Sequence, residues 1–212
     1  TTNISTHTNP TTDPTLYTTL PLPPLKPYCI RLIFNNANAL PTEDESLLCH
    51  SLTNYFSLEP TILGLIETRR NWRRSEETTK PLRRTANNLQ KCKVKLATAN
   101  CHEDHSAWNP KQPGGVAQLV LNTITSLVSD TGADPLGRWT WHKIRLDGLR
   151  SLFVITAYRV CKQPPTTSKM TTAWHQQYRK LVKRGIRNPD PRAQFFKDIT
   201  KLLRDITNSG SL

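Results

Sequence analysis

The short apolar run Ile62–Ile66 constrains the fold more than any other stretch of this sequence. It reads Ile-Leu-Gly-Leu-Ile and leads directly into Glu67, Thr68, Arg69 and Arg70. A run of this length without alternation is typical of a strand that is buried on both faces. A carboxylate at the end of such a strand costs free energy unless a cation or hydrogen-bond donors compensate it. The sequence leaves two partners open for Glu67, which are the neighbouring arginines at a solvated strand end or a bound divalent cation.

A strand–helix–strand unit surrounds this run. The segment Tyr28–Phe34 alternates apolar and polar side chains and predicts a first strand, which an asparagine-rich turn ends. A capping box of Thr42 and Glu45 predicts the start of a helix before the second strand. Such units usually make their two strands parallel neighbours. Asn36 and Glu67 are therefore expected at one edge of a sheet, where open α/β sheets place their ligand sites.

Later segments predict further strands and two closing helices. Strands are expected at residues 93–99, 116–121, 139–146 and 152–158. The last of these strands is apolar on both faces, so we expect it at the centre of its sheet. One helix is expected around residues 174–181. A second is expected from Asp190, because an N-cap residue followed by Pro191 is a good helix start.

The charge balance favours a polyanionic partner. The 212 residues include 29 Lys and Arg against 16 Asp and Glu, which gives a formal charge of +13. Ten of the basic residues lie between Arg69 and Lys95, and Trp72 lies within this run. Cationic side chains near an aromatic ring suit a nucleic-acid strand, although a solvated helix face explains the same residues. No apolar stretch approaches the length of a membrane helix, so nucleic acid is favoured over a membrane.

The N-terminal region indicates the domain organisation, and the cysteines indicate the cellular compartment. Residues 1–27 are rich in Thr and Pro and predict a flexible leader, which leaves one domain over residues 28–212. The first residue is Thr1, which indicates a fragment or a processed chain. Five widely spaced cysteines indicate a reducing, intracellular compartment rather than a disulfide framework. No usual zinc-ligand spacing relates Cys92, Cys101, His102 and His105.

Five short stretches in a fixed order carry a resemblance to a known superfamily. They span residues 30–161 and read IRLIFNNANAL, ILGLIETRRNW, KQPGGVAQLVL, LGRWTWHKIRL and LFVITAYRVC. Together they resemble the endonuclease/exonuclease/phosphatase superfamily, and most of all the endonuclease domain of non-LTR retrotransposons. The resemblance implies an α/β fold in which two mixed sheets pack face to face with helices outside, a four-layer sandwich. It also implies that this sandwich is incomplete here, with the second sheet largely missing.

The same resemblance implies a reaction and a set of site residues. The reaction is metal-dependent hydrolysis of a phosphodiester, with DNA as the substrate and Mg²⁺ or Mn²⁺ as the cofactor. Glu67 matches the acidic metal ligand, and Asn36 matches the asparagine that helps to place the metal and the scissile phosphate. Tyr158 matches the tyrosine that hydrogen-bonds the phosphate or the attacking water. The expected nucleic-acid contacts are Asn38, Arg69, Arg70, Arg73 and Arg159.

Several positions depart from the family pattern. Phe34–Asn35 stands where the family often has tryptophan, and Ala39 replaces a frequent glycine. Both departures make the match of Asn36 less specific. Asn38 competes with Asn36 for the same position in the family pattern, and the alternative role of Asn36 is that of an ordinary turn asparagine. Tyr158 also fits the alternative of a core tyrosine with a satisfied hydroxyl.

Two family segments are expected beyond Leu212. One is a Gly-Asp-x-Asn segment whose aspartate positions or deprotonates the nucleophilic water, and the other is an Asp-His pair whose histidine contacts the phosphate. The chain as given is therefore expected to hold the metal side of the site and to be weak or inactive alone. The remainder of a larger polyprotein with a reverse transcriptase is an expected partner, and the nucleus is an expected location.

Two other function classes remain open from the sequence. One is a basic nucleic-acid-binding remnant without catalysis, whose affinity would depend steeply on salt and not on metal. The other is a hydrolase of the same superfamily that acts on lipid or inositol phosphates.

Overall fold

Two sheets and four α-helices make up the computed structural model of this chain. It describes residues 23–26, 29–41, 44–101, 110–148, 150–162 and 172–209. The elements in chain order are β1 (Leu32–Asn36), α1 (Glu45–Phe56), β2 (Ile62–Ile66), α2 (Thr79–Gln90), β3 (Lys95–Ala99), β4 (Val116–Val120), the 3₁₀ helix η3 (Asn122–Leu127), β5 (Val128–Ala133), β6 (Trp139–Arg145), β7 (Ser151–Ala157), α3 (Ala173–Lys183) and α4 (Pro191–Ser209). The predicted leader lies almost entirely outside the described residues.

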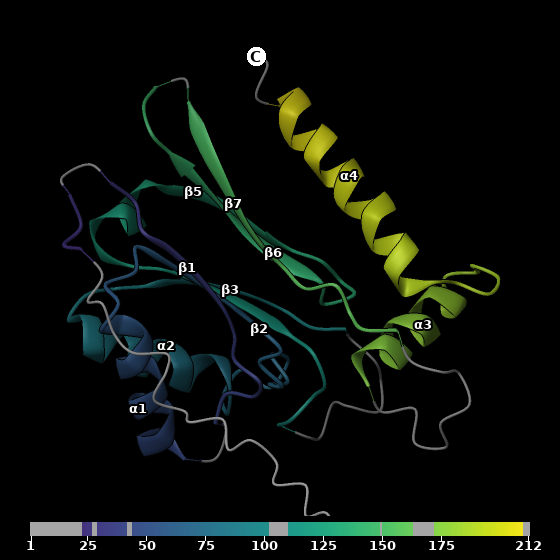
Figure 1. Cartoon of the computed structure of the whole chain (residues 1–212), viewed down its shortest axis with the longest axis horizontal. Coiled ribbons are helices and arrows are strands. Elements are labelled where there is room, and N and C mark those ends of the chain that lie inside the picture. Colours follow the sequence, from purple (N-terminus) through teal and green to yellow (C-terminus); the bar gives the residue numbers. More distant parts are fainter. Residues whose placement is uncertain are drawn as a thin grey trace, which may run out of the picture.

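The first sheet is mixed and has the strand order β1-β2-β4-β3. β1 and β2 are parallel, with Asn36 opposite Ile66, which confirms the arrangement expected for a strand–helix–strand unit. β4 runs antiparallel to both β2 and β3. Helices α1 and α2 cover the outer face of this sheet (Figure 1). The core between helices and sheet is apolar and includes Leu48, Leu52, Leu82, Leu63, Leu65 and Leu119.

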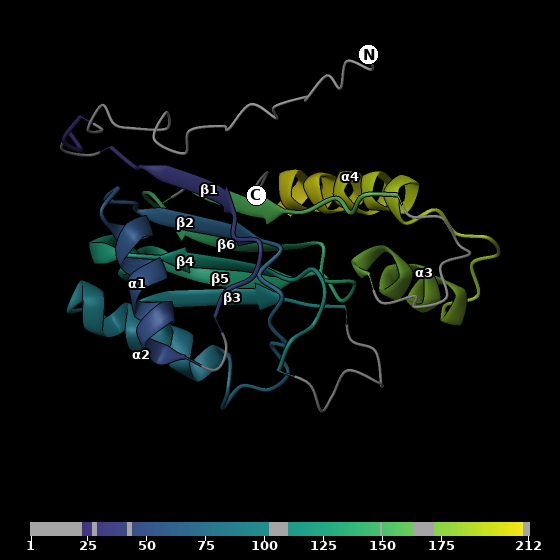
Figure 2. The same cartoon turned by 60° about the horizontal axis from the view of Figure 1, so that its bottom comes forward.

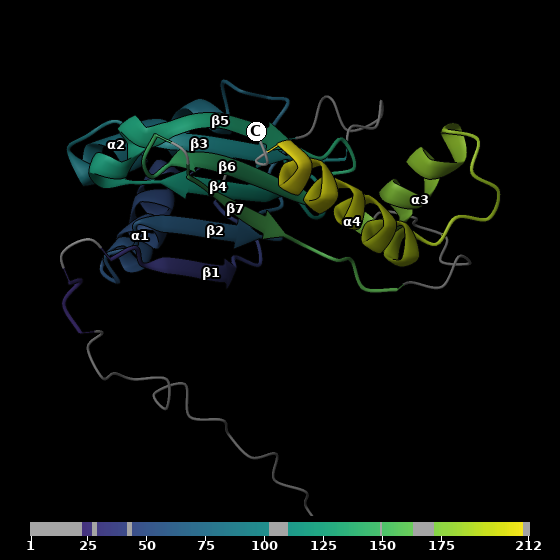
Figure 3. The same ribbon diagram turned by 90° about the horizontal axis from the view of Figure 1, so that it is seen from above.

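The second sheet is antiparallel, with the strand order β5-β6-β7, and it packs on the inner face of the first. Ile62 and Val120 from the first sheet share a core with Ile144 and Val154 from the second. On the far side of the second sheet, Phe195 of α4 packs edge-on against Trp139, with ring centroids 5.6 Å apart. The order of layers is thus helices, sheet, sheet, helix (Figures 2 and 3). The expected α/β sandwich is confirmed.

Two features of the second sheet differ from the sequence expectation. β7 is not central in the described sheet, because it pairs only with β6 there. Its outer face is apolar because Phe153 packs against Trp141 of β6. The strand β5 was not predicted, since Val-Ser-Asp-Thr-Gly-Ala is mostly polar and owes its extended form to pairing with β6.

The start of α1 and the extent of β1 also differ from the sequence expectation. The N-cap of α1 is Asp44, whose side chain accepts hydrogen bonds from the backbone N–H groups of Ser46 and Leu47. The expected capping box is therefore wrong, and Thr42 lies outside the described residues. β1 extends through Asn36, so this residue ends the strand rather than belonging to the turn after it.

The inner face of β1 is only partly covered. Leu32 is 45% exposed and Phe34 is 51% exposed, although both are large and apolar. The nearest described strand of the second sheet, β7, packs mainly against β2 and β4. A small cavity of about 370 Å³ remains beside β1, and its lining includes Phe34, Asn36 and Ile155.

A buried chain of polar side chains connects the two sheets. Gln118 on β4 donates from Nε2 to Thr156 Oγ1 on β7 at 2.8 Å. Its Oε1 lies 2.7 Å from Nδ1 of His142 on β6, which requires the tautomer with a proton on Nδ1. All three side chains are buried. Burial, with a smaller contribution from the charge of Lys95, lowers the pKa of His142 to about 4.

The low pKa of His142 predicts a loss of stability in acid. Its ordinary pKa is 6.5, so between pH 6.5 and about 4 the unfolded chain binds a proton that the folded chain does not. Stability should be full above pH 6.5 and should fall by at most about 3 kcal/mol as the pH approaches 4. Urea unfolding across this range measures the slope. His142→Gln should flatten it, whereas His50→Gln, at an exposed position, should leave it unchanged. An unaltered slope in His142→Gln would contradict the assignment.

Two further expectations concern membranes and cysteines. Within the described residues, no helix combines the length and the apolar character needed to cross a bilayer. All five cysteines are free thiols, and Cys101 is buried whereas Cys92 is exposed. His102 and His105 lie outside the described residues.

Candidate active site

Three loops meet at the carboxyl ends of β1 and β2. The backbone N–H of Ala39, after β1, donates to the carbonyl of Glu67, after β2, at 2.9 Å. The N–H of Thr68 in turn donates to the carbonyl of Gly115, before β4, at 3.2 Å. Because the backbone of each loop is hydrogen-bonded to the next, the side chains that the loops carry are held at fixed positions.

The backbone of these loops is strained. Glu67 and Arg69 both have φ of 51°, and Ala39 has φ of 87°, which side chains with a Cβ rarely adopt. Gly115 has φ of 85°, and a Cβ there would lie 2.7 Å from Thr68 Oγ1. Each such conformation costs about 1–3 kcal/mol and persists only where the surroundings enforce it, which is common at functional sites.

Asn36, Glu67 and Tyr158 converge at this point. Asn36 donates from Nδ2 to Glu67 Oε2 at 2.9 Å. The hydroxyl of Tyr158 donates to the other carboxylate oxygen, Glu67 Oε1. The Asn36 amide is oriented by the backbone N–H of Asn38, which donates to Asn36 Oδ1 at 3.0 Å. The structure therefore brings together the three side chains that the sequence singled out as the catalytic set.

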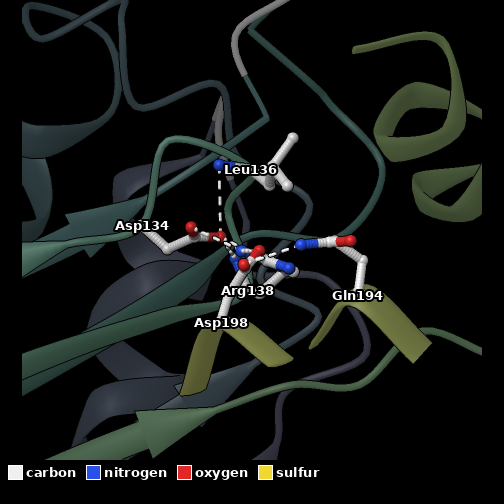
Figure 4. A network of polar contacts seen from close by, with 5 residues as sticks. All are labelled: Asp134, Leu136, Arg138, Gln194 and Asp198. Carbon is white, nitrogen blue, oxygen red and sulfur yellow. Dashed lines mark hydrogen bonds and ion pairs between the residues drawn. The ribbon is translucent and has the colours of Figure 1, made fainter. Parts of the chain in front are cut away.

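A buried ion-pair network holds the segment that carries Tyr158. The backbone N–H of Tyr158 donates to the carbonyl of Arg138 at 2.7 Å. Arg138 donates from Nε and Nη2 to the two oxygens of Asp134, at 2.7 and 2.9 Å, and from Nη2 to Asp198 Oδ2 at 2.8 Å. Gln194 completes the network by donating to Asp198 Oδ1 (Figure 4). Arg138 thus ties the β5–β6 turn to α4 behind the site.

Tyr158 remains a hydrogen-bond donor throughout the physiological pH range. Burial raises the pKa of its phenol well above the ordinary value, and the hydrogen bond to Glu67 and the charge of that carboxylate raise it further. A phenol that does not ionise can donate to a carboxylate or a phosphate oxygen without repelling it. It does not act as a base.

The donor atoms at this point fit a hard divalent cation. Glu67 offers a carboxylate, and each of its oxygens keeps a lone pair beyond its present hydrogen bond. Asn36, which the sequence also suggested as a ligand, turns its Nδ2 toward Glu67 and its oxygen toward the backbone N–H of Asn38. Mg²⁺ and Mn²⁺ prefer oxygen ligands, and Mg²⁺ is often held by one or two carboxylates plus water and phosphate. Across the part of the chain that the structure describes, no three His, Cys, Asp or Glu side chains gather as a metal cluster. A carboxylate of this kind is a ligand type that hard cations such as Mg²⁺ and Mn²⁺ accept.

Glu67 and Tyr158 line a cavity of about 730 Å³, a size typical of ligand sites. Arg69 and Lys111 contribute cationic side chains to the same lining. The remaining lining residues are mostly apolar or small and are Ala39, Leu40, Gln112, Pro113, Gly114, Val160, Cys161, Thr172, Ala173 and Trp174. Sequence reasoning did not find Lys111, Gln112 or Trp174, although the first two directly precede the Pro-Gly-Gly turn.

The expected nucleic-acid contacts divide into accessible and buried residues. Arg69 is exposed and lines the cavity, and Asn38 is exposed next to Asn36. Arg73 and Arg159 are exposed outside the cavity lining. The guanidinium of Arg159 lies over the ring of Phe196, 5.1 Å from its centroid.

The expectation that Arg70 contacts nucleic acid is wrong, because this side chain is fully buried and offers no surface to a nucleic acid. Its Nη1 donates to the carbonyl of Thr78 at 2.8 Å, and its guanidinium lies 6.0 Å from the ring centroid of Trp72. Burial lowers the pKa of Arg70 to about 10. The side chain packs inside the loop that leads to α2 and has a structural role.

The candidate site consists of one amide, one carboxylate and one phenol, which lie at the ends of β1, β2 and β7, respectively. Glu67 and Tyr158 share a cavity with two cationic side chains, whereas Asn36 lines the smaller cavity beside β1. No model of a known protein family matches this chain, and no curated protein has a similar sequence.

Proposed function

We propose that this chain provides the metal-binding side of a Mg²⁺- or Mn²⁺-dependent phosphodiester hydrolase that acts on DNA. The observation that carries the proposal is the convergence on Glu67, whose two oxygens accept hydrogen bonds from Asn36 and from Tyr158. A single carboxylate held in this way, in a cavity that two cationic side chains also line, is suited to a metal ion and a phosphate anion.

Each side chain of the set has a role that its geometry supports. Glu67 would hold the metal ion, and Asn36 orients the carboxylate through its Nδ2 while its oxygen accepts from the backbone N–H of Asn38. When bound, the metal neutralises the charge that builds on the phosphate oxygens. Tyr158, which stays protonated, would donate a hydrogen bond to a phosphate oxygen or to the attacking water.

The preference for DNA rests on charge. The formal charge of +13 favours a polyanion, and Arg69 and Lys111 place two of the positive charges at the cavity itself. The resemblance to retrotransposon endonucleases points the same way. In this proposal the chain is part of a mobile-element polyprotein that includes a reverse transcriptase, and its work takes place in the nucleus.

Catalysis by the chain alone is expected to be weak. Glu67 is the only carboxylate, and no histidine is present, among the residues that line the described cavity. The general base, which the resemblance assigns to the aspartate of a Gly-Asp-x-Asn segment, is therefore not supplied by these lining residues.

Metal binding tests the proposal most directly. The full chain should bind Mn²⁺ at one site, measured by electron paramagnetic resonance of the free ion. Glu67→Gln should weaken binding by at least about tenfold, because it removes the only carboxylate of the set. Glu76→Gln is the matched control, since Glu76 is an exposed carboxylate that pairs with Lys80 on the surface. Equal Mn²⁺ affinity in the wild type and Glu67→Gln would overturn the proposed site.

Nicking of supercoiled plasmid separates the proposal from its alternatives. We expect slow, metal-dependent nicking that Glu67→Gln abolishes. DNA binding that depends steeply on salt, and neither on metal nor on Glu67, would favour a basic binding remnant instead. Glu67-dependent nicking at the rate of an intact nuclease would contradict the expectation of weak activity.

A further inference from the structure

The proposed site is divided between the two sheets. Asn36 ends β1 and Glu67 follows β2 in the first sheet, whereas Tyr158 follows β7 in the second. The hydrogen bond from the Tyr158 hydroxyl to Glu67 Oε1 therefore spans the sandwich. Its geometry depends on how far apart the sheets lie at this end and on where β7 lies along β2. Apolar packing between the sheets is not directional, so it does not by itself fix either quantity.

A buried polar contact joins the sheets two residues before Tyr158. Gln118, in the middle of β4, donates from Nε2 to Oγ1 of Thr156 on β7 at 2.8 Å. Its Oε1 lies 2.7 Å from Nδ1 of His142, so the same amide also holds β6. The side chains of Gln118, Thr156 and His142 are at most 1% exposed. Because hydrogen bonds constrain both length and direction, a buried network of this kind favours one arrangement of the two sheets.

A glycine makes room for this contact. Gly64 lies directly opposite Gln118 in the pairing of β2 with β4, so both residues face the second sheet. A Cβ on Gly64 would lie 2.4 Å from Thr156 Oγ1 and 2.4 Å from Cδ1 of Phe34. The Phe34 ring is half-exposed and can turn aside, whereas Thr156 is held by the amide of Gln118. The missing side chain at Gly64 therefore lets β7 approach β2 three residues before Glu67.

The contact lies close to the site along both strands. Consecutive residues of a strand advance about 3.3 Å, so Thr156 lies about 7 Å from Tyr158 and Gly64 about 10 Å from Glu67. The backbone N–H of Tyr158 donates to the carbonyl of Arg138 at 2.7 Å, which continues the pairing of β7 with β6 as far as Tyr158. A displacement of β7 at Thr156 is therefore passed on to Tyr158 instead of being absorbed by a loose connection.

We propose that Gln118 and Gly64 are positioning residues for Tyr158. The amide of Gln118 holds Thr156 against the first sheet, and the missing side chain at Gly64 permits that close approach. Together they set the position from which the Tyr158 hydroxyl donates to Glu67. The inference rests on the proposed function and adds to it two residues, both outside the lining of the larger cavity, that determine the geometry of the site.

Exchange of the Tyr158 hydroxyl proton with water tests this in the full 212-residue chain. A phenol that donates to a carboxylate exchanges its proton when that hydrogen bond opens. Nuclear magnetic resonance of the chain with ¹³C-labelled tyrosine rings follows the exchange, and Tyr158→Phe assigns the signal. Gln118→Met keeps the length of the side chain and removes both of its hydrogen bonds. We expect exchange about tenfold faster in Gln118→Met than in the wild type.

Gly64→Ala reaches the same contact from the other sheet. The added methyl group should displace Thr156 while the amide of Gln118 is kept, and exchange should again be about tenfold faster. Val154→Ala is the matched control, because Val154 is a buried apolar residue on the same strand and packs in the core between the sheets. It should lower the free energy of unfolding, measured in urea, and leave the exchange rate of the Tyr158 proton unchanged. If Gly64→Ala does not fold, the comparison of Gln118→Met with Val154→Ala decides.

Nicking of supercoiled plasmid with Mn²⁺ connects the contact to the reaction. Gln118→Met should lower the rate, and Gln118→Met combined with Tyr158→Phe should be no slower than Tyr158→Phe alone. The two losses are expected not to add, because both act through the same hydroxyl. A residue that only stabilised the fold would lower the rates of the wild type and of Tyr158→Phe by the same factor.

The outcomes separate this inference from the proposed function. Unchanged exchange in Gln118→Met, or equally faster exchange in Gln118→Met and Val154→Ala, overturns the positioning role while the Glu67 site stands. Additive losses of nicking rate overturn it as well. Equal Mn²⁺ affinity of the wild type and Glu67→Gln overturns the proposed function, and the exchange rates, which need no metal, still decide whether the contact positions Tyr158. Faster exchange in Gln118→Met that Val154→Ala does not show supports the positioning role.

Discussion

Replacing Arg138 with Met is expected to lower the free energy of unfolding by about 3–5 kcal/mol, the typical cost of breaking a buried ion pair from one side. The side chains of Arg138 and Asp134 are only 2% and 3% exposed. The substitution would leave the Asp134 carboxylate in the interior without its counter-ion. Although burial lowers the pKa of Arg138, its hydrogen bonds to Asp134 and Asp198 raise the net pKa, so the pair is charged in the folded protein. Urea unfolding at pH 7 measures the loss.

Two further variants distinguish the broken pair from a general packing defect. Asp198→Asn should cost only about 1 kcal/mol or less, because the Asp198 side chain is 30% exposed and the pair with Asp134 remains. Combining Arg138→Met with Asp134→Asn should recover much of the loss, since no buried charge is then left alone and an amide oxygen still accepts from the backbone N–H groups of Leu136 and Arg138. A loss of less than 1 kcal/mol in Arg138→Met would show that the network in Figure 4 contributes little to stability.

The same network has a functional consequence. Tyr158 is the donor to Glu67 Oε1, and its backbone N–H donates to the carbonyl of Arg138. The β5–β6 turn and α4 therefore support the proposed site from behind, although neither element contributes a side chain to it. Supporting interactions of this kind determine how closely a functional side chain keeps its geometry.

Local sequence signals were sufficient to predict where Glu67 and Asn36 lie in the fold. The run Ile62–Ile66 has the composition of a buried strand, and the structure places it between β1 and β4, so Glu67 emerges at a strand end as expected. The strand–helix–strand unit placed Asn36 beside it, because parallel neighbours bring their carboxyl ends together. These predictions held because each depends on a few adjacent residues and on a handedness rule that has few exceptions.

Features that depend on contacts between distant segments could not be predicted from local sequence signals. Arg69 and Arg70 are chemically identical neighbours, yet the first is exposed at the cavity and the second is buried. The difference arises from the positive φ of Arg69 and from the pairing of Arg70 with Lys111 across the loop, neither of which has a local signal. β5 is likewise a strand only because β6 offers a partner, which tertiary context decides.

Gly137→Ala is the second substitution for which we expect a large loss of stability, about 3–5 kcal/mol. Gly137 has φ of 71° in the turn before β6, a conformation that costs about 1–3 kcal/mol for a residue with a Cβ. A Cβ there would lie 2.3 Å from the backbone N of Cys101 and 2.4 Å from the backbone C of Asn100. Backbone atoms cannot rotate away as a side chain can, so the turn and the segment after β3 must separate, which adds a further overpacking cost of about 1–3 kcal/mol.

Gly148→Ala is the matched control for this prediction. A Cβ at Gly148 would meet no atom within 4 Å, and its φ lies outside the left-handed region. The same chemical change should therefore alter the free energy of unfolding by no more than about 0.5 kcal/mol, as at other open surface positions. Thermal and urea unfolding of the two variants side by side measure the difference. If Gly137→Ala unfolded at the same urea concentration as Gly148→Ala, the close approach of the β6 turn to Asn100 and Cys101 would be wrong. The position of Arg138, the next residue, behind Tyr158 would then be in doubt as well.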